Sequence, residues 1–176
     1  MTRIAFVFFC VAGFVAPALA EVVDSSASGF SIRIAADVDA APAAVYRAIA
    51  QVGSWWNPDH TWSGSAANLS LDNRAGGCFC EKLPTGSVQH MVVVYIDGTK
   101  TLRLAGGLGP LQSLGVAGSL TFLVNPGTDG KTRLEVTYNV GGYVPGGLAQ
   151  LAPVVDEVLR GQVERLGKYA VTGRPQ

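Results

Sequence analysis

Residues 132–170, TRLEVTYNVGGYVPGGLAQLAPVVDEVLRGQVERLGKYA, contain the strongest secondary-structure patterns of the chain. The first part, residues 132–140, alternates apolar and polar side chains, which predicts a strand with one face in the core and one in water. After a glycine-rich turn, apolar residues recur every three or four positions from Leu148 to Ala170, which predicts a long amphipathic helix. Because such a helix must bury its apolar stripe, we expect it to pack on a sheet that contains the strand.

The sequence upstream supplies the rest of that sheet. Residues 30–38 alternate like residues 132–140, and a helix is expected to begin at Pro42, followed by a second short helix or structured loop at residues 55–62. The expected order is β-α-α-β6-α, an α+β fold in which a curved antiparallel sheet of about six or seven strands wraps on the terminal helix. The further strands are expected at residues 68–72, 76–82, 87–96, 101–105 and 116–124.

Residues 1–20 have the features of a cleavable export signal. Arg3 provides a positive start, Ile4–Ala16 is apolar and uncharged, and Ala18-Leu19-Ala20 is typical of a cleavage site. We therefore predict cleavage between Ala20 and Glu21. The mature chain would be one domain, residues 21–176, in the periplasm or outside the cell.

The composition restricts the partners. The formal net charge is zero and no basic run is present, which argues against nucleic acid as a partner. No stable membrane insertion is expected after cleavage, and the sequence leaves the oligomeric state open. The glycine-rich stretches at 106–109 and 141–142 lack the spacing of a dinucleotide-binding motif, so no cofactor is expected. The remaining partner class is a small hydrophobic molecule or lipid.

Several local motifs resemble one known superfamily. They are Val38–Pro42 leading into a helix, the pair Trp55-Trp56, Gly76–Cys80 on a strand, and the helix ending Leu159–Leu166. Together they resemble the START-like, or SRPBCC, superfamily, which includes polyketide cyclases and dehydrases, lipid-transfer domains and activator-of-chaperone-ATPase-like domains. The resemblance covers residues 30–170 and implies a helix-grip fold with a ligand cavity. Residues 55–71 and 106–114 are more narrowly similar to an exported bacterial subgroup of unknown role.

A ligand cavity between the sheet and the terminal helix would have apolar walls. The candidates are the aromatic and aliphatic side chains expected on the inner faces of these elements, with one histidine among them. Because neighbouring strand positions point to opposite faces, part of this set is expected to fail. The predicted lining residues are Trp55, Trp56, Trp62, Phe79, His90, Val92, Leu108, Leu111, Phe122, Tyr138, Leu151, Val155 and Leu159.

Two kinds of chemistry are open at the expected hairpin of residues 76–96. If paired positions sum to an even number, His90 shares a face with Cys78 and Cys80, a set of side chains that can bind zinc or copper. If the sum is odd, His90 shares a face with Glu81, and an acid–base pair results. The remaining histidine, His60, is a further candidate proton carrier, and simple packing is the alternative for every one of these residues.

The preferred function is binding of a hydrophobic or amphipathic molecule by an exported protein. The first alternative is a cyclase- or aromatase-like enzyme that uses His90 or Glu81, which a histidine–carboxylate hydrogen bond inside the pocket would favour. The second alternative is a non-catalytic partner-binding module, which predicts a filled core and an exposed apolar patch on the loop Gly106–Gly115. A solidly packed interior would exclude the preferred function.

Overall fold

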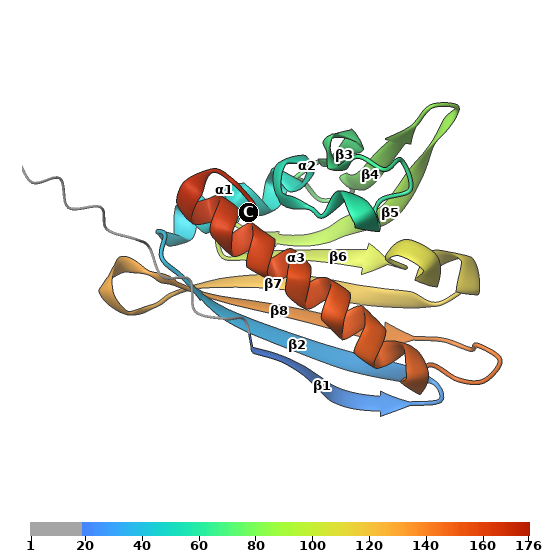
Figure 1. Cartoon of the computed structure of the whole chain (residues 1–176). Coiled ribbons are helices and arrows are strands. Elements are labelled where there is room, and N and C mark those ends of the chain that lie inside the picture. The colour runs from blue at the N-terminus through green and yellow to red at the C-terminus, as the bar shows by residue number, and fades with distance from the viewer. Residues whose placement is uncertain (1–18) are drawn as a thin grey trace, which may run out of the picture.

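A computed structural model describes residues 19–176 as an antiparallel sheet of eight strands covered on one face by helices (Figure 1). The strand order is β1-β2-β8-β7-β6-β5-β4-β3. The strands are β1 (Leu19–Ser26), β2 (Gly29–Val38), β3 (Leu69–Leu71), β4 (Cys78–Leu83), β5 (Gly86–Asp97), β6 (Thr101–Gly106), β7 (Ala117–Pro126) and β8 (Thr132–Gly141). The helices are α1 (Pro42–Ala50), α2 (Val52–Trp55) and α3 (Ala152–Thr172), with short 3₁₀ turns η1 (Pro58–His60), η2 (Ala66–Asn68), η3 (Gly109–Leu114), η4 (Thr128–Gly130) and η5 (Ala149–Leu151).

The helix α3 lies diagonally across the inner face of the sheet and ends beside α1 (Figure 1). Its buried residues Leu159, Val163 and Leu166 recur at helical spacing and face the sheet. Every second residue of β2 is buried in turn, so strand and helix cover each other's apolar face. In residues 19–176, no helix has the length and apolarity needed to cross a membrane.

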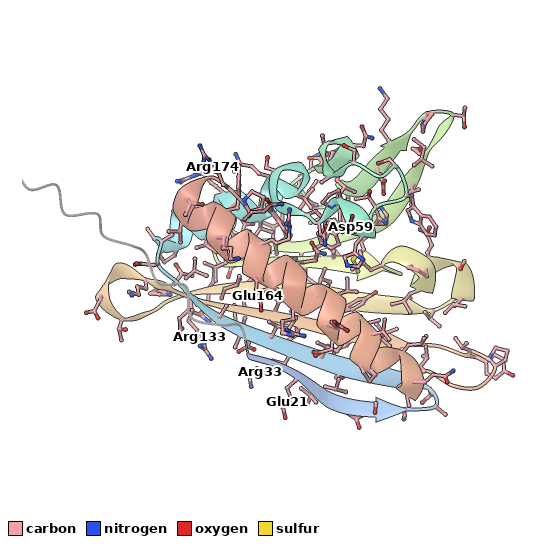
Figure 2. The ribbon with its side chains drawn as sticks, viewed as in Figure 1. Glu21, Arg33, Asp59, Arg133, Glu164 and Arg174 are labelled. Carbon is pink, nitrogen blue, oxygen red and sulfur yellow. A yellow bond between two sulfur atoms is a disulfide. The ribbon has the colours of Figure 1, made fainter. Side chains whose placement is uncertain are left out.

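The opposite face of the sheet is polar over β2 and β8. Arg33 on β2 forms an ion pair with Glu135 on β8 at 2.6 Å, and Arg133 pairs with Asp37 at 3.0 Å. Figure 2 labels both arginines on these strands. This arrangement is the one that the alternation of residues 30–38 and 132–140 predicts, with the apolar side chains turned toward α3.

The predicted fold class and element order are confirmed, but the predicted number of strands was too low. The missing strand is β1, which pairs with β2 at the edge of the sheet. Its sequence does not alternate, because the register shifts between Val22 and Asp24 and leaves Val23 exposed in a bulge. The predicted signal peptide lies almost wholly outside the described residues. Its expected cleavage after Ala20 falls inside β1 and would leave residues 21–26 to pair with β2.

Candidate ligand-binding cavity

A cavity of about 460 Å³ lies between the first half of α3 and the strands β4 and β5. The segment from Trp56 to Trp62 forms one wall and the η3 segment forms another. The interior is therefore not packed solid. A solidly packed interior would have excluded the predicted ligand site. The lining residues are Trp56, Asp59, His60, Thr61, Trp62, Leu69, Phe79, His90, Leu108, Gly109, Pro110, Leu111, Leu114, Leu151, Val154, Val155, Val158 and Leu159.

The predicted lining set is brought together in large part. The residues that do line the cavity come from four separate stretches of the chain, which the fold gathers around α3. They are Trp56, Trp62, Phe79, His90, Leu108, Leu111, Leu151, Val155 and Leu159. The predicted set was wrong for Trp55, Val92, Phe122 and Tyr138, which lie outside the lining.

Two of these four belong to the core beside the cavity. Trp55 is buried, and its indole N–H donates to the carbonyl oxygen of Ala48 at 2.7 Å, so the side chain closes the junction of α1 and α2. Phe122 on β7 is buried near Trp55, under the helices. The two adjacent tryptophans therefore have different positions, because Trp55 lies in the core and Trp56 lies in the cavity wall.

The other two lie on strands, one on the outer face of the sheet and one in the core beneath the loop of residues 106–115. Val92 lies opposite Cys78 on the outer face of the β4–β5 pair. Tyr138 is fully buried on β8, and its hydroxyl accepts a hydrogen bond from the backbone N–H of Leu108 at 3.1 Å. Burial raises the pKa of Tyr138 to about 12, so the hydroxyl keeps its proton and donates it to the carbonyl oxygen of Gly106 at 3.4 Å. Tyr138 thus supports the loop that forms a cavity wall.

That loop is the apolar segment Gly106–Gly115. Leu111 is buried and Leu108 is half-buried, and both line the cavity. The side-chain amide of Gln112 also donates to the carbonyl oxygen of Gln89 on β5, next to His90. The loop therefore contributes Leu108 and Leu111 to the cavity wall and leaves Leu114 exposed at the rim, where Trp62 and Val154 are exposed as well. The predicted partner-binding patch on this loop stays a prediction.

The sequence prediction missed several lining residues. Val154 and Val158 lie on α3 beside Val155, and their spacing of four residues was a signal that could have found them. No periodicity marks the rest, because they come from turns or, for Leu69, from a strand of only three residues. The missed residues are Asp59, Thr61, Leu69, Gly109, Pro110, Leu114, Val154 and Val158. Figure 2 labels Asp59 on the segment that leads from α2 toward β3.

A β-bulge places His90 in the cavity wall. Phe79 pairs with Met91, but the next residue of β4, Cys80, pairs with Gln89, so His90 is the extra residue of β5. Both His90 and Met91 are buried, although consecutive strand residues normally point to opposite faces. The paired positions sum to an even number before the bulge and to an odd number after it.

The odd register places Glu81 and His90 together. Oε2 of Glu81 lies 3.0 Å from Nε2 of His90, and Oε1 accepts from the backbone N–H of Ser63 at 2.5 Å. Burial alone would raise the pKa of Glu81, but hydrogen bonds from Ser63, from the Trp62 backbone and from His90 outweigh it and lower the pKa below its ordinary value. Because an ionised carboxylate only accepts hydrogen bonds, Nε2 of His90 carries the hydrogen and donates it to Glu81.

Cys78 and Cys80 do not form the metal site that an even sum of paired positions would have allowed. Cys78 and Cys80 are joined by a disulfide across a Cα–Cα distance of 5.4 Å, which is within the usual range. Their side chains are half-buried on the face opposite Phe79 and Glu81. Two sulfurs that are bonded to each other, on the other face from His90, do not share a site with it. Among residues 19–176, no group of three metal-binding side chains occurs.

The cavity has a buried end and an open end. Phe79, His90 and Leu159 are at most 6% exposed, whereas Trp62 and Val154 at the rim are 56% and 61% exposed. His60 also lies at the open end and is exposed, and its carbonyl oxygen accepts the indole N–H of Trp56 at 3.0 Å. Of the two candidate histidines, only His90 therefore has a carboxylate partner and a buried setting.

Solved structures share this fold. CalU16 from Micromonospora echinospora matches with a TM-score of 0.57 at 15% identity, over 84% of this chain and 78% of that one. Mll3558 from Rhizobium loti matches with 0.58 at 19% identity, over 89% and 97%. TTHA0849 from Thermus thermophilus matches with 0.55 at 16% identity, over 81% and 98%.

No protein-family model matches the chain, and no curated protein matches its sequence. Likeness at the identities of these solved structures describes the fold alone, because one fold hosts many functions. The chain therefore has a helix-grip, START-like fold, in which an antiparallel sheet packs against a long C-terminal helix.

Proposed function

We propose that this chain is an exported protein that binds a small hydrophobic or amphipathic molecule in the cavity beside α3. The observation that carries the proposal is the cavity itself, about 460 Å³ with walls that are mostly apolar. Sites for small molecules have volumes of roughly 300–1,000 Å³. The driving force would be removal of apolar ligand and wall surface from water.

The few polar groups of the wall are suited to orienting a ligand and not to binding an anionic one. Within the described residues, no lysine or arginine lines the cavity, so a phosphate or sulfate would lose its hydration without a cationic partner. Asp59 and His60 lie at the open end, and His90 lies at the buried end. A ligand with an apolar body and one uncharged polar group fits this distribution.

Export is supported by two independent features. Residues 1–20 have the pattern of a cleavable signal, and Cys78 and Cys80 form a disulfide of the kind that persists in oxidising compartments. Sequencing the N-terminus of the protein from a periplasmic fraction tests this part. Glu21 as the first residue is the expected result, and an intact Met1 found in the cytoplasm would reject it.

Native mass spectrometry of protein purified without detergent tests the binding function. We expect a discrete added mass that solvent extraction removes. The variant Val155→Trp narrows the cavity and should reduce the fraction of protein that carries the added mass, whereas Lys168→Trp on the exposed face of α3 should leave that fraction unchanged. An equal fraction in Val155→Trp and the wild type would place the molecule elsewhere on the protein.

The hydrogen bond between His90 and Glu81 favours a second candidate, acid–base catalysis. In this reading Nδ1 of His90 takes a proton from a carbon next to a ligand carbonyl, and the Glu81 carboxylate stabilises the resulting imidazolium. The test is exchange of the acidic C–H protons of 2-tetralone in D₂O, followed by mass. Faster exchange with the wild type than with His90→Gln supports catalysis, and equal rates exclude this role.

A further inference from the structure

The two ring nitrogens of His90 have different partners. Nε2 is hydrogen-bonded to Glu81 at 3.0 Å. In residues 19–176, no group forms a hydrogen bond with Nδ1, and the ring lies in the cavity wall. Nδ1 is therefore the polar atom that the buried end of the cavity presents to a ligand.

The partner of Nε2 is itself held in one orientation. The backbone N–H of Ser63 donates to Oε1 of Glu81, while Oε2 faces His90. A backbone N–H can only donate a hydrogen bond. In any variant of residue 81 that keeps this contact, the atom that faces Ser63 must therefore be an acceptor. The atom that faces His90 then decides which ring nitrogen of His90 carries the hydrogen.

In the neutral imidazole, a Glu81 carboxylate that faces Nε2 keeps the one ring hydrogen on Nε2 and leaves Nδ1 as an acceptor. A ligand that fills the buried end covers Nδ1, and an acceptor that is covered without a partner is costly, so a ligand that provides a donor gains over one that does not. Because the lining contains no lysine or arginine among the described residues, an anionic ligand group has no counter-ion there. The Asp59 carboxylate, which could pair with a cationic group, lies at the open end and not beside His90. An uncharged hydroxyl is the donor that fits.

We propose that the cavity selects an apolar ligand that carries a hydroxyl group, that Nδ1 of His90 accepts the hydroxyl hydrogen, and that Glu81 sets this preference by fixing the tautomer of His90. The proposal rests on the proposed function and deepens it by naming the ligand class. Here His90 is the residue that touches the ligand, and Glu81 is a positioning residue.

The variant Glu81→Gln tests the proposal because it changes the tautomer and leaves the shape almost unchanged. The N–H of Ser63 requires the amide oxygen of the glutamine, which turns the amide NH₂ toward Nε2 of His90. Nε2 then becomes an acceptor and the ring hydrogen moves to Nδ1. The cavity of this variant presents a donor and should prefer a ligand that can only accept.

Three probes of similar shape separate these cases: 2-naphthol carries a hydroxyl donor, 2-methoxynaphthalene can only accept, and 2-methylnaphthalene does neither. Their dissociation constants follow from displacement of the uncharged fluorophore N-phenyl-1-naphthylamine. We expect the Kd of 2-methoxynaphthalene divided by that of 2-naphthol to fall by roughly 10-fold from wild type to Glu81→Gln. Differences in probe hydrophobicity cancel in this comparison between proteins.

The outcomes separate the two proposals. An unchanged ratio in a variant that still binds 2-methylnaphthalene would overturn hydroxyl selection while leaving the cavity as a ligand site. If no probe displaces the fluorophore from the wild type, the proposed function itself fails. Should Glu81→Gln not fold, His90→Phe serves instead. It should abolish the advantage of 2-naphthol without reversing it, and a retained advantage would overturn the proposal.

Discussion

Nε2 of His90 lies 3.0 Å from Oε2 of Glu81, and both side chains are nearly inaccessible to water. The contact exists because β5 carries one extra residue opposite β4, which turns His90 to the face that Glu81 occupies. A buried carboxylate is costly without hydrogen bonds, so this pair and the N–H of Ser63 stabilise one another. The bulge thus gives the mostly apolar cavity a buried polar side chain, His90.

The stability of the fold should depend on the ionisation of Glu81. Its pKa is below the ordinary value of 4.5 in the folded chain, so the ionised form favours folding. This contribution is fully present above that ordinary value and is lost as the pH falls through the lowered folded pKa. In urea titrations, the free energy of unfolding should therefore fall less steeply with acid in Glu81→Gln than in the wild type. An equal pH dependence of the unfolding free energy in both proteins would contradict the lowered pKa of Glu81.

The disulfide should protect both cysteines yet contribute little to stability. Cys78 and Cys80 close a ring of only three residues, for which the chain-entropy model gives roughly 1.5 kcal/mol. The mature protein should resist iodoacetamide until it is reduced and then gain two additions. The double variant Cys78→Ser, Cys80→Ser should lose no more than this amount in urea unfolding. Alkylation without a reductant would show that the bond does not form.

Tyr138→Phe should loosen one wall of the cavity. The substitution removes the hydroxyl that accepts from the N–H of Leu108 and donates to Gly106. We expect a loss of about 0.5–1.5 kcal/mol in unfolding free energy and faster hydrogen exchange at the Leu108 amide. Tyr95→Phe is the control, because that ring is exposed on β5. Unchanged exchange at Leu108 would show that the loop holds its position without Tyr138.

Alanine substitutions of Trp62 and Trp55 should have different effects, the first mainly on ligand binding and the second mainly on stability. Trp62 is 56% exposed at the rim, so Trp62→Ala should change stability by no more than about 0.5 kcal/mol while weakening fluorophore binding several-fold. Trp55 is buried in the core, and Trp55→Ala should cost about 3–5 kcal/mol. Thermal unfolding and fluorophore titration check both variants. Full binding by Trp62→Ala would remove that ring from the site.

The fold could be predicted because two periodicities dominate the chain. Residues 30–38 and 132–140 alternate over their whole length, and α3 repeats its apolar residues at helical spacing. A strand or a helix with one apolar face must bury that face against another element. Here the sheet and α3 bury their apolar faces against each other. By contrast, β1 was missed because the bulge at Val23 interrupts its alternation.

The site could be predicted only in part, for a related reason. Residues on α3 and on the Trp56–Trp62 segment could be assigned to the cavity by type and place. The register of β4 with β5 could not, because the sequence allows either parity and the bulge at His90 uses both. Sequence patterns assume two residues per repeat along a strand, so they contain no signal for an inserted residue that turns His90 and Met91 to the same face.

A titration of the purified mature protein with N-phenyl-1-naphthylamine tests directly whether the cavity beside α3 binds an apolar ligand. The wild type and Lys168→Trp should show saturable fluorescence enhancement with one site per chain. Val155→Trp should show less enhancement at the same fluorophore concentration, because the new ring narrows the cavity. Equal enhancement by Val155→Trp and the wild type, or none by the wild type, would contradict the claim.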